Sequence, residues 1–302
     1  MKKKVLSLTG ILFMVLMASL LWAGQVVTEE QRLWAQNALA QEKALGVAAG
    51  SNTVAVLYFH NKSGKSRLNP LQKGLAFMLM TDLSRLEQIQ LLERVKLQAL
   101  FEELDLGVSG LVDAETAPRV GKLAGARYLV GGDILASDLA DLGIRSDLLD
   151  VPDESLLGQP LREGALSELL DLEKQILFEI IALLEVELSA QQKHELEKPL
   201  TANIKALFNL FYAIDSTDRG QYYRAQAYYQ KALRQDPELR PAQEGLDELQ
   251  SLNLVGSTNR SKEMLKSLEE KTSQTDSVVD DDTKRRSKDP GDLGLGQIRV
   301  NW

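Results

Sequence analysis

The segment from Thr53 to Asp133 constrains the fold of this chain more than any other. The spacing of its hydrophobic residues changes repeatedly between 2 residues, as in strands, and 3.6 residues, as in helices. It opens with the run Thr53–Asn61, in which most consecutive residues are hydrophobic. Such a run is typical of a strand that is covered by helices on both faces. Apolar residues then recur at helical spacing over residues 70–86, which predicts an amphipathic helix with its apolar stripe on the sheet.

Further strands follow in the same part of the chain. Apolar runs predict short strands at Ile89–Leu92 and Tyr128–Val130, and an alternating pattern predicts another at Ile144–Val151. Strands that are separated by helices indicate a parallel or mixed sheet in an α/β layer arrangement. We therefore expect residues 51–160 to form a three-layer α/β module with a mostly buried mixed sheet.

Two helices are predicted between these strands. One carries its apolar residues from Leu97 to Leu104 and should end near Gly107. For the next helix, Asp113 is a suitable N-cap and Gly125 a suitable end.

The beginning of the chain has the layout of a secretory signal peptide. Lys2, Lys3 and Lys4 form a basic region, the stretch Val5–Trp22 is apolar, and small residues stand at positions 23 and 24. We expect residues 1–24 to direct export and to be removed before Gln25. The alternative is an uncleaved membrane anchor, since an apolar run of about 18 residues can just span a bilayer.

Composition excludes several function classes. The formal charge of −8 becomes −11 without the three lysines, whereas nucleic-acid binding requires a basic surface. The chain has no cysteine, so disulfides, thiolate metal sites and lipidation of an N-terminal cysteine are excluded. No second apolar run approaches the length of a transmembrane helix, so we expect no stable membrane span in the mature chain.

The remaining segments differ from the α/β module in character. Residues 25–50 are polar and alanine-rich, and predict a short helix or a loosely attached arm. Residues 161–200 are predicted to be connecting helices, including one long apolar helix at 163–185 that is too charged to cross a membrane. Residues 201–253 are predicted to be an all-helical hairpin. The tail at 254–302 is rich in Ser, Thr, Asp and Lys, which is typical of disorder.

Within the helical segment, residues 209–242 resemble a single tetratricopeptide repeat. The matching positions are Ala213, Gly220, Tyr222, Ala225, Tyr229, Ala232 and Pro237. Asn209 and Ser216 depart from the pattern, since aromatic residues usually stand there. Stacked repeats normally need about three copies for independent stability. A single repeat is therefore expected to pack on the 163–185 helix or to help the chain oligomerise, and an ordinary helical hairpin remains the alternative.

The α/β segment itself resembles a known family. The series Val54–Phe59, Gly74–Ala76, Leu92–Arg94 and Gly121–Gly132 is similar, in this order, to the periplasmic core of the CsgG family. It is equally similar to the N-terminal domain that TolB-type proteins share with that family. The resemblance covers about 80 residues and implies a bacterial cell-envelope protein. For CsgG itself it implies a ring-shaped outer-membrane secretion channel for curli subunits.

Two features separate this chain from the channel members of the family. Those members are anchored through an acylated N-terminal cysteine, which this chain lacks. They also contribute membrane-spanning strands, each of which needs roughly 9–11 alternating residues. The candidate stretches at 134–151 and 155–166 are short and are interrupted by residues such as Asp141 and Pro160.

No catalytic constellation is recognisable in the sequence. The loop Asn61–Ser66 is similar to the end of a phosphate-binding loop, but Phe59 occupies the position of the required first glycine. Gly291, Gly294 and Gly296 follow no strand, so they are not a dinucleotide-binding motif. His60 and His194 are expected to be surface residues. We therefore expect a non-enzymatic protein without a cofactor or metal site.

These observations lead to one functional expectation and one alternative. The first is a periplasmic binding or assembly protein of the cell envelope, located at the periphery of the outer membrane. It acts on protein partners whose identity the sequence does not reveal, and a homo-oligomer is one form that it could take. The alternative is a homo-oligomeric outer-membrane export component. Exposed aromatic and basic side chains are common interface anchors. The candidate interaction residues are Asn61, Lys62, Lys65, Arg67, Tyr222, Tyr223 and Tyr229.

Overall fold

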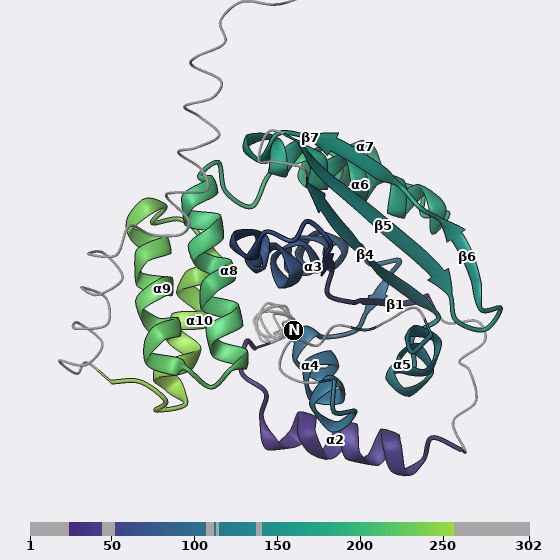
Figure 1. Ribbon diagram of the computed structural model, residues 1–302, viewed down its shortest axis with the longest axis horizontal. Coiled ribbons are helices and arrows are strands. Elements are labelled where there is room, and N and C mark those ends of the chain that lie inside the picture. The colour runs from purple at the N-terminus through teal and green to yellow at the C-terminus, as the bar shows by residue number, and fades with distance from the viewer. Residues whose placement is uncertain (1–23, 44–51, 107–111, 113–114, 137–140, 257–302) are drawn as a thin grey trace, which may run out of the picture.

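The chain folds around a mixed sheet of seven strands that helices cover on both faces (Figure 1). The computed structural model describes residues 24–43, 52–106, 112, 115–136 and 141–256. A second, helical region lies beside the sheet and its helices. The expected fold class, a three-layer α/β module followed by an all-α region, is thereby confirmed.

The strands are arranged in the order β3-β1-β4-β5-β6, with β2 beside β4 and β7 beside β5. Strand β1 is parallel to β3 and β4, whereas β4, β5, β6 and β7 pair in antiparallel fashion. The strands are β1 (Thr53–Val56), β2 (His60–Asn61), β3 (Gln90–Leu91), β4 (Tyr128–Ala136), β5 (Leu142–Asp150), β6 (Ser155–Gly158) and β7 (Leu161–Gly164).

Helices α3 (Pro70–Leu83) and α6 (Leu169–Leu183) cover one face of the sheet. Side chains at alternate positions of β4 and β5, such as Val130 and Leu148, are fully buried on this face. The close approach of α6 is visible at Gly158, where an added Cβ would lie 2.5 Å from the Leu183 side chain.

The opposite face is covered only in part by described residues. Helix α5 (Ala117–Ala124) lies over one end of β4, since a Cβ at Gly121 would lie 3.0 Å from Leu129. Helix α4 (Arg94–Glu103) lies next to α5. Helix α2 (Glu29–Ala40) packs on the outside of α4, as Figure 1 shows.

The N-terminal part of the described chain is firmly held. Residues 29–40 form a helix, which agrees with one of the two expectations for residues 25–50. An ion pair holds this helix to α4, because Arg32 Nη1 lies 2.6 Å from Glu102 Oε2. The residues before α2 are buried between other elements, with Gln25 and Val26 both 8% exposed. The alternative expectation, a loosely attached arm, is therefore wrong for residues 24–40.

The helical region consists of three helices, preceded by the short helix α7 (Ala190–Glu197). They are α8 (Ile204–Asp218), α9 (Tyr222–Gln235) and α10 (Arg240–Ser251). Helices α8 and α9 form a hairpin on which α10 packs, and α8 packs against α3. At this contact a Cβ on Gly74 of α3 would lie 2.4 Å from the Phe211 ring, so only glycine allows the two helices to approach so closely.

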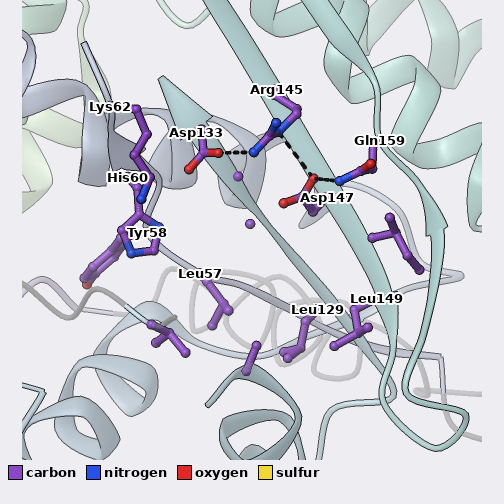
Figure 2. Close-up of a pocket in the computed structure, with 15 residues that line it drawn as sticks. Leu57, Tyr58, His60, Lys62, Leu129, Asp133, Arg145, Asp147, Leu149 and Gln159 are labelled. Carbon is purple, nitrogen blue, oxygen red and sulfur yellow. Dashed lines mark hydrogen bonds and ion pairs between the residues drawn. The ribbon is translucent and has the colours of Figure 1, made fainter. Parts of the chain in front are cut away.

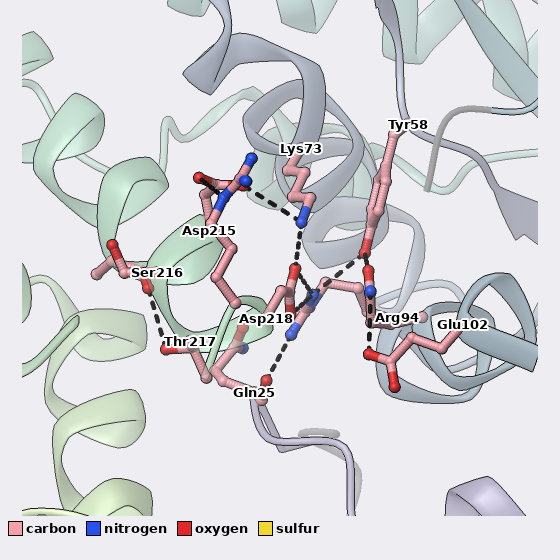
Figure 3. Close-up of polar contacts among 12 residues, drawn as sticks. Gln25, Tyr58, Lys73, Arg94, Glu102, Asp215, Ser216, Thr217 and Asp218 are labelled. Atoms are coloured by element: carbon pink, nitrogen blue, oxygen red, sulfur yellow. Dashed lines mark hydrogen bonds and ion pairs between the residues drawn. The ribbon is translucent and has the colours of Figure 1, made fainter. Parts of the chain in front are cut away.

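A buried ionic cluster joins the helical region to the α/β module (Figure 3). The Asp218 carboxylate is fully buried and accepts hydrogen bonds from Lys73 Nζ at 2.8 Å and from Arg94 Nη1 at 2.9 Å. Arg94 Nη1 also donates to the Tyr58 hydroxyl at 3.2 Å. Burial raises the pKa of Tyr58, and the nearby Arg94 offsets this only in part. One carboxylate on α8 therefore contacts two cations, on α3 and α4, and Asp215 of the same helix is a second partner of Lys73 at 3.4 Å.

The structure corrects several details of the predicted elements. The predicted strand at 53–61 is interrupted at Leu57–Phe59, because the Phe59 N–H donates to the Gln72 carbonyl of α3 rather than to a strand. Helix α3 is not amphipathic, since every residue of it except Gln72 is buried. It lies between the sheet and α8, so both of its sides contact other elements.

Two further elements differ in position. Helix α5 begins at Ala117 with Thr116 as its N-cap, so Asp113 does not cap it; Asp113 itself lies outside the described residues. The predicted end at Gly125 is confirmed. Residues 161–164 form strand β7 rather than part of a helix, because they pair with Leu142–Arg145 of β5.

The expected signal peptide and the expected disordered tail lie outside the described residues, apart from Gly24 and from residues 254–256. The helical hairpin predicted at 201–253 is present, with Ala213, Ala225 and Ala232 fully buried where the helices approach. Its identity as a tetratricopeptide repeat stays a prediction.

A conservative change tests the ionic cluster. We expect Asp218→Asn to lower the free energy of unfolding by about 3–5 kcal/mol, because it leaves Arg94 buried without a counter-charge and leaves Lys73 with only the partly exposed Asp215 at 3.4 Å. Urea unfolding followed by circular dichroism measures this. Asp215→Asn is the matched control, since that side chain is 32% exposed and its ion pairs are worth less than about 1 kcal/mol. Equal losses in the two variants would contradict the assigned role of Asp218.

A second buried charged group lies between α3 and α6. Glu173 is 1% exposed, and its neighbour Lys174 makes an ion pair with Asp82. Burial, together with the charge of Asp82, raises the pKa of Glu173 to about 8. Burial also raises the pKa of Asp82, although Lys174 opposes this. The folded protein therefore retains a proton on Glu173 that the unfolded chain releases.

This protonation has a measurable consequence. Between the unfolded pKa near 4.5 and the folded pKa of about 8, the folded state binds more protons, so stability falls as the pH rises through this range. We expect Glu173→Gln to remove this fall and to make the protein more stable than the wild type at pH 8. Urea unfolding at pH 5, 6.5 and 8 tests the expectation. Glu179→Gln, on the same helix but 39% exposed, should keep the wild-type trend.

Candidate functional site: a cleft on the sheet

The register of the central strands places a row of side chains on the partly covered face of the sheet. Leu129 pairs with Leu149, Gly131 with Asp147, and Asp133 with Arg145. Helix α5 lies over the Leu129 end of this row. Beyond it the described residues leave a cleft of about 490 Å³, which we call the sheet cleft (Figure 2).

The floor of the sheet cleft is apolar. Leu57, which directly follows β1, lies along it with Leu129 of β4 and Leu149 of β5, and Leu156 of β6 continues it to the edge of the sheet. These leucines follow from the period of two in the strands, which brings every second side chain to the same face.

The polar side chains of the sheet cleft bind one another. Arg145 makes an ion pair with Asp133, and its Nε lies 3.9 Å from Asp147 Oδ1. Gln159 Nε2 donates to the same Asp147 oxygen at 2.8 Å. Figure 2 shows this chain of contacts running from Asp133 of β4 to Gln159, which follows β6. His60 and Lys62 stand at the other end. The cleft therefore combines an apolar floor with a pre-organised polar rim.

Two consecutive glycines shape the wall between β4 and β5. Gly132 has a φ of 151°, and a Cβ there would lie only 1.9 Å from the Arg145 carbonyl oxygen. A Cβ at Gly131 would meet nothing closer than Leu57 Cβ at 3.6 Å, which is ordinary contact. Gly132 thus permits the close approach of the two strands, whereas Gly131 leaves open space above the cleft floor.

The outer edge of the cleft is a strand edge with exposed leucines. Strands β6 and β7 both pair with β5 and have no neighbour on their other side within the part of the chain that the structure describes. Leu156, Leu157 and Leu161 are 40–48% exposed along this edge. Exposed leucines beside an apolar cleft form a surface that is suited to contact with another polypeptide.

The predicted interaction loop is divided between two roles. The Asn61 side chain closes the loop, because it donates to the Lys65 carbonyl at 2.9 Å and to Asn69 Oδ1 at 2.7 Å. Lys62 is exposed and lines the sheet cleft. Lys65 and Arg67 are partly exposed and line neither the sheet cleft nor the second cleft described next.

The end of this loop meets the helical hairpin at a second, polar cleft of about 400 Å³. Ser66 and Asn69 lie on one side, with Arg219 and Arg224 on the other. The two predicted regions, loop and hairpin, are therefore adjacent. Nearby, the rings of Tyr212 and Tyr228 stack at 5.1 Å.

The three predicted hairpin tyrosines have different environments. Tyr222 and Tyr223 are partly exposed and pack against the core. Tyr229 is fully buried, and the ring lies so close to α10 that a Cβ at Gly245 would be 2.5 Å from it. Tyr229 is therefore not an interface residue. The reason is helix α10, which covers the side of the hairpin where the Tyr229 ring lies.

Several residues of the sheet cleft were not predicted as site residues. Arg145 and Asp147 lie 12 and 14 residues after Asp133 in sequence, and the antiparallel register of β4 and β5 brings them close to it. The alternation at Ile144–Val151 correctly predicted a strand, but it did not show which face stays open. His60 is half-buried at the cleft, whereas His194 is exposed as expected.

The charged side chains that β4 and β5 contribute to the sheet cleft are engaged with one another. Its two carboxylates are engaged by Arg145 and Gln159, an arrangement that fixes shape. Within the described ranges, no group of three or more His, Asp or Glu side chains is placed to hold a metal ion. The helices of the same ranges include none that is both long and apolar enough to cross a membrane.

Comparison with known proteins supports the family resemblance for part of the chain. Residues 35–140 match the family described as curli production assembly/transport component CsgG. The matched segment begins within α2 and extends just past the end of β4, and it contains one wall of the sheet cleft. This segment of the chain is therefore CsgG-like.

A solved structure also matches, at low similarity. The C-terminal domain of LpoB from Salmonella enterica is 15% identical, with coverage of 43% of this chain and 94% of that domain. The TM-score is 0.31, which does not establish a shared fold. Among curated proteins, none matches this chain.

The two glycines provide a matched pair of variants. We expect Gly132→Ala to lower the free energy of unfolding by about 2–4 kcal/mol, because the new methyl group collides with the backbone of β5. Gly131→Ala should change stability by less than about 1 kcal/mol. Urea unfolding of both variants tests this expectation. A stable Gly132→Ala protein with unchanged circular dichroism would show that the strands are not held this closely.

Proposed function

We propose that this protein is a non-enzymatic binding or assembly protein of the bacterial cell envelope, and that the sheet cleft with its β6–β7 edge is the main binding surface. The observation that carries the proposal is the apolar floor of the cleft, which continues to the exposed leucines of an open strand edge. The match to the CsgG family supports the envelope location, because that family serves curli assembly and transport.

The chemistry of the cleft favours an extended polypeptide as the partner. An added strand satisfies its main-chain groups at a sheet edge, and pockets for alternate side chains supply specificity. Leu156 and Leu161 stand on the cleft side of this edge, because they pair with Leu149 and Arg145 respectively. A partner strand with apolar residues at every second position would extend the floor of the cleft.

The proposal extends to location and to a second contact surface. We infer that the protein works in the periplasm, after removal of the expected signal peptide. The partly exposed Tyr222 and Tyr223, together with the polar cleft between loop and hairpin, provide a separate surface for a second partner. The proposed tetratricopeptide character of the hairpin agrees with such a role, since repeats of that kind bind proteins.

A homo-oligomeric export component is the second candidate. The observation in its favour is the family description, which names transport as well as assembly. The open β6–β7 edge serves equally well for contact between copies. Fractionation separates the candidates, because an export component should remain in the membrane fraction after a high-salt wash and dissolve only in detergent.

Site-specific photo-crosslinking tests the main proposal. We expect a photoreactive amino acid at Leu156 to give a small number of defined adducts in living cells. The same group at Leu33, which is also exposed but lies on α2 far from the cleft, is the control. Leu161→Asp should abolish the adducts formed from position 156, because it places a charge on the exposed edge without disturbing the core. Identical adducts from positions 156 and 33 would refute the cleft as the binding surface.

A further inference from the structure

The chain immediately before α2 is held by a carboxylate of the last described helix. Both the Gln25 and the Val26 main-chain nitrogens donate to the Glu248 side chain of α10, the latter at 3.2 Å. Arg94 Nη2 donates to the Gln25 carbonyl at 2.7 Å, as Figure 3 shows. Residues 25 and 26 therefore form a strap between α4 and α10.

The surroundings of Gln25 are crowded on the side from which the chain arrives. A Cβ at Gly24 would lie 2.2 Å from Glu248 Oε1, so any other residue at this position would push the carboxylate away. A larger residue at position 24 would therefore displace the Glu248 carboxylate from its contact with the strap.

Two groups at the strap are incompletely satisfied. Glu248 is partly buried, and within the described part of the chain it has no cationic partner. The Gln25 Oε1 atom is buried, and no described residue donates a hydrogen bond to it. A carboxylate and an amide oxygen without enough donors therefore lie beside the same main-chain nitrogen.

We propose that the mature protein begins at Gln25 and that its new terminal ammonium group forms an ion pair with Glu248. Hydrolysis of the Gly24–Gln25 peptide bond consumes one water molecule. It leaves a carboxylate on Gly24 and an amino group on Gln25 that is protonated at neutral pH. The catalyst is the peptidase that removes export leaders.

The change from an amide to an ammonium fits both unsatisfied groups. The nitrogen gains a positive charge opposite Glu248, and charge-assisted hydrogen bonds are shorter and stronger than neutral ones. The nitrogen also gains two protons. One of them can be donated to Gln25 Oε1, which is an acceptor on the same residue. Processing thus fastens α4 to α10, and this role does not depend on what the sheet cleft binds.

The position of the cut is tested on the native protein. Intact mass and N-terminal sequencing of the protein from the periplasmic fraction should place the first residue at Gln25. A first residue at any other position overturns the proposal.

The ion pair is tested with two purified chains that differ by one residue. One begins at Gln25 and the other retains Gly24; both are released from a cleavable fusion without extra residues. We expect the chain that begins at Gln25 to have a melting temperature about 2–4 °C higher than the chain that retains Gly24. A shift of this size corresponds to a modest stabilisation in a protein of this length. Glu248→Gln should abolish the difference, because it removes the charge that the ammonium meets.

A matched control lies one turn away on α10. Glu244 makes a surface ion pair with Arg240, so Glu244→Gln should leave the difference between the two chains intact. Equal melting temperatures of the two wild-type chains, or a difference that persists in Glu248→Gln, would overturn the proposed ion pair. Because these measurements use isolated protein, they leave the proposed binding function of the cleft untouched in either case.

Discussion

The buried carboxylate of Asp218 is the interaction on which the arrangement of this protein depends. Lys73 and Arg94 belong to the α/β module, and neither cation has room for water, since both side chains are 5% exposed or less. Burying two positive charges is costly unless a negative charge accompanies them. The last turn of α8 supplies that charge, so the helical region completes the α/β module.

The same cluster reaches the other elements in turn. Through Arg94 it holds the main chain at Gln25, and through the Tyr58 hydroxyl it reaches Gln98 on α4. Helices α3 and α4, which stand on different sides of β1, are thereby fixed relative to α8. The contacts of this cluster therefore link elements on both faces of the sheet.

The layered fold was predictable because periodicity reports local structure. The uninterrupted apolar run at Val54–Phe59 correctly indicated burial on both faces, and Gly125 correctly indicated a helix end. Two predictions were wrong, the start of α5 and the helix at 161–164, because tertiary contacts and not local periodicity determine these two segments. Strand β7 has only four residues, and its pairing with β5 determines its structure more than its own propensity does.

The candidate site was less predictable than the fold, because register and covering helices decide it. Lys62, which the sequence predicts as an interaction residue, lines the sheet cleft, and its role there stays a prediction. The sequence gives no sign that Asp133, Arg145 and Asp147 belong to one site. Only the pairing of β4 with β5 shows it. Tyr229 was misassigned because the sequence pattern of a hairpin does not show that a third helix covers it. Charge pairs such as Lys73–Asp218, separated by 145 positions, leave no local signal at all.

The break between β6 and β7 sets a limit on how this protein associates. Residue 160 is a proline, which has no main-chain N–H to offer to an incoming strand, and the ladder also shifts register at Leu148 and Leu149. An open edge without such interruptions is a template on which further strands add repeatedly. Here each uninterrupted stretch has only four residues. The edge can hold one short guest, and it is poorly built to seed a fibre.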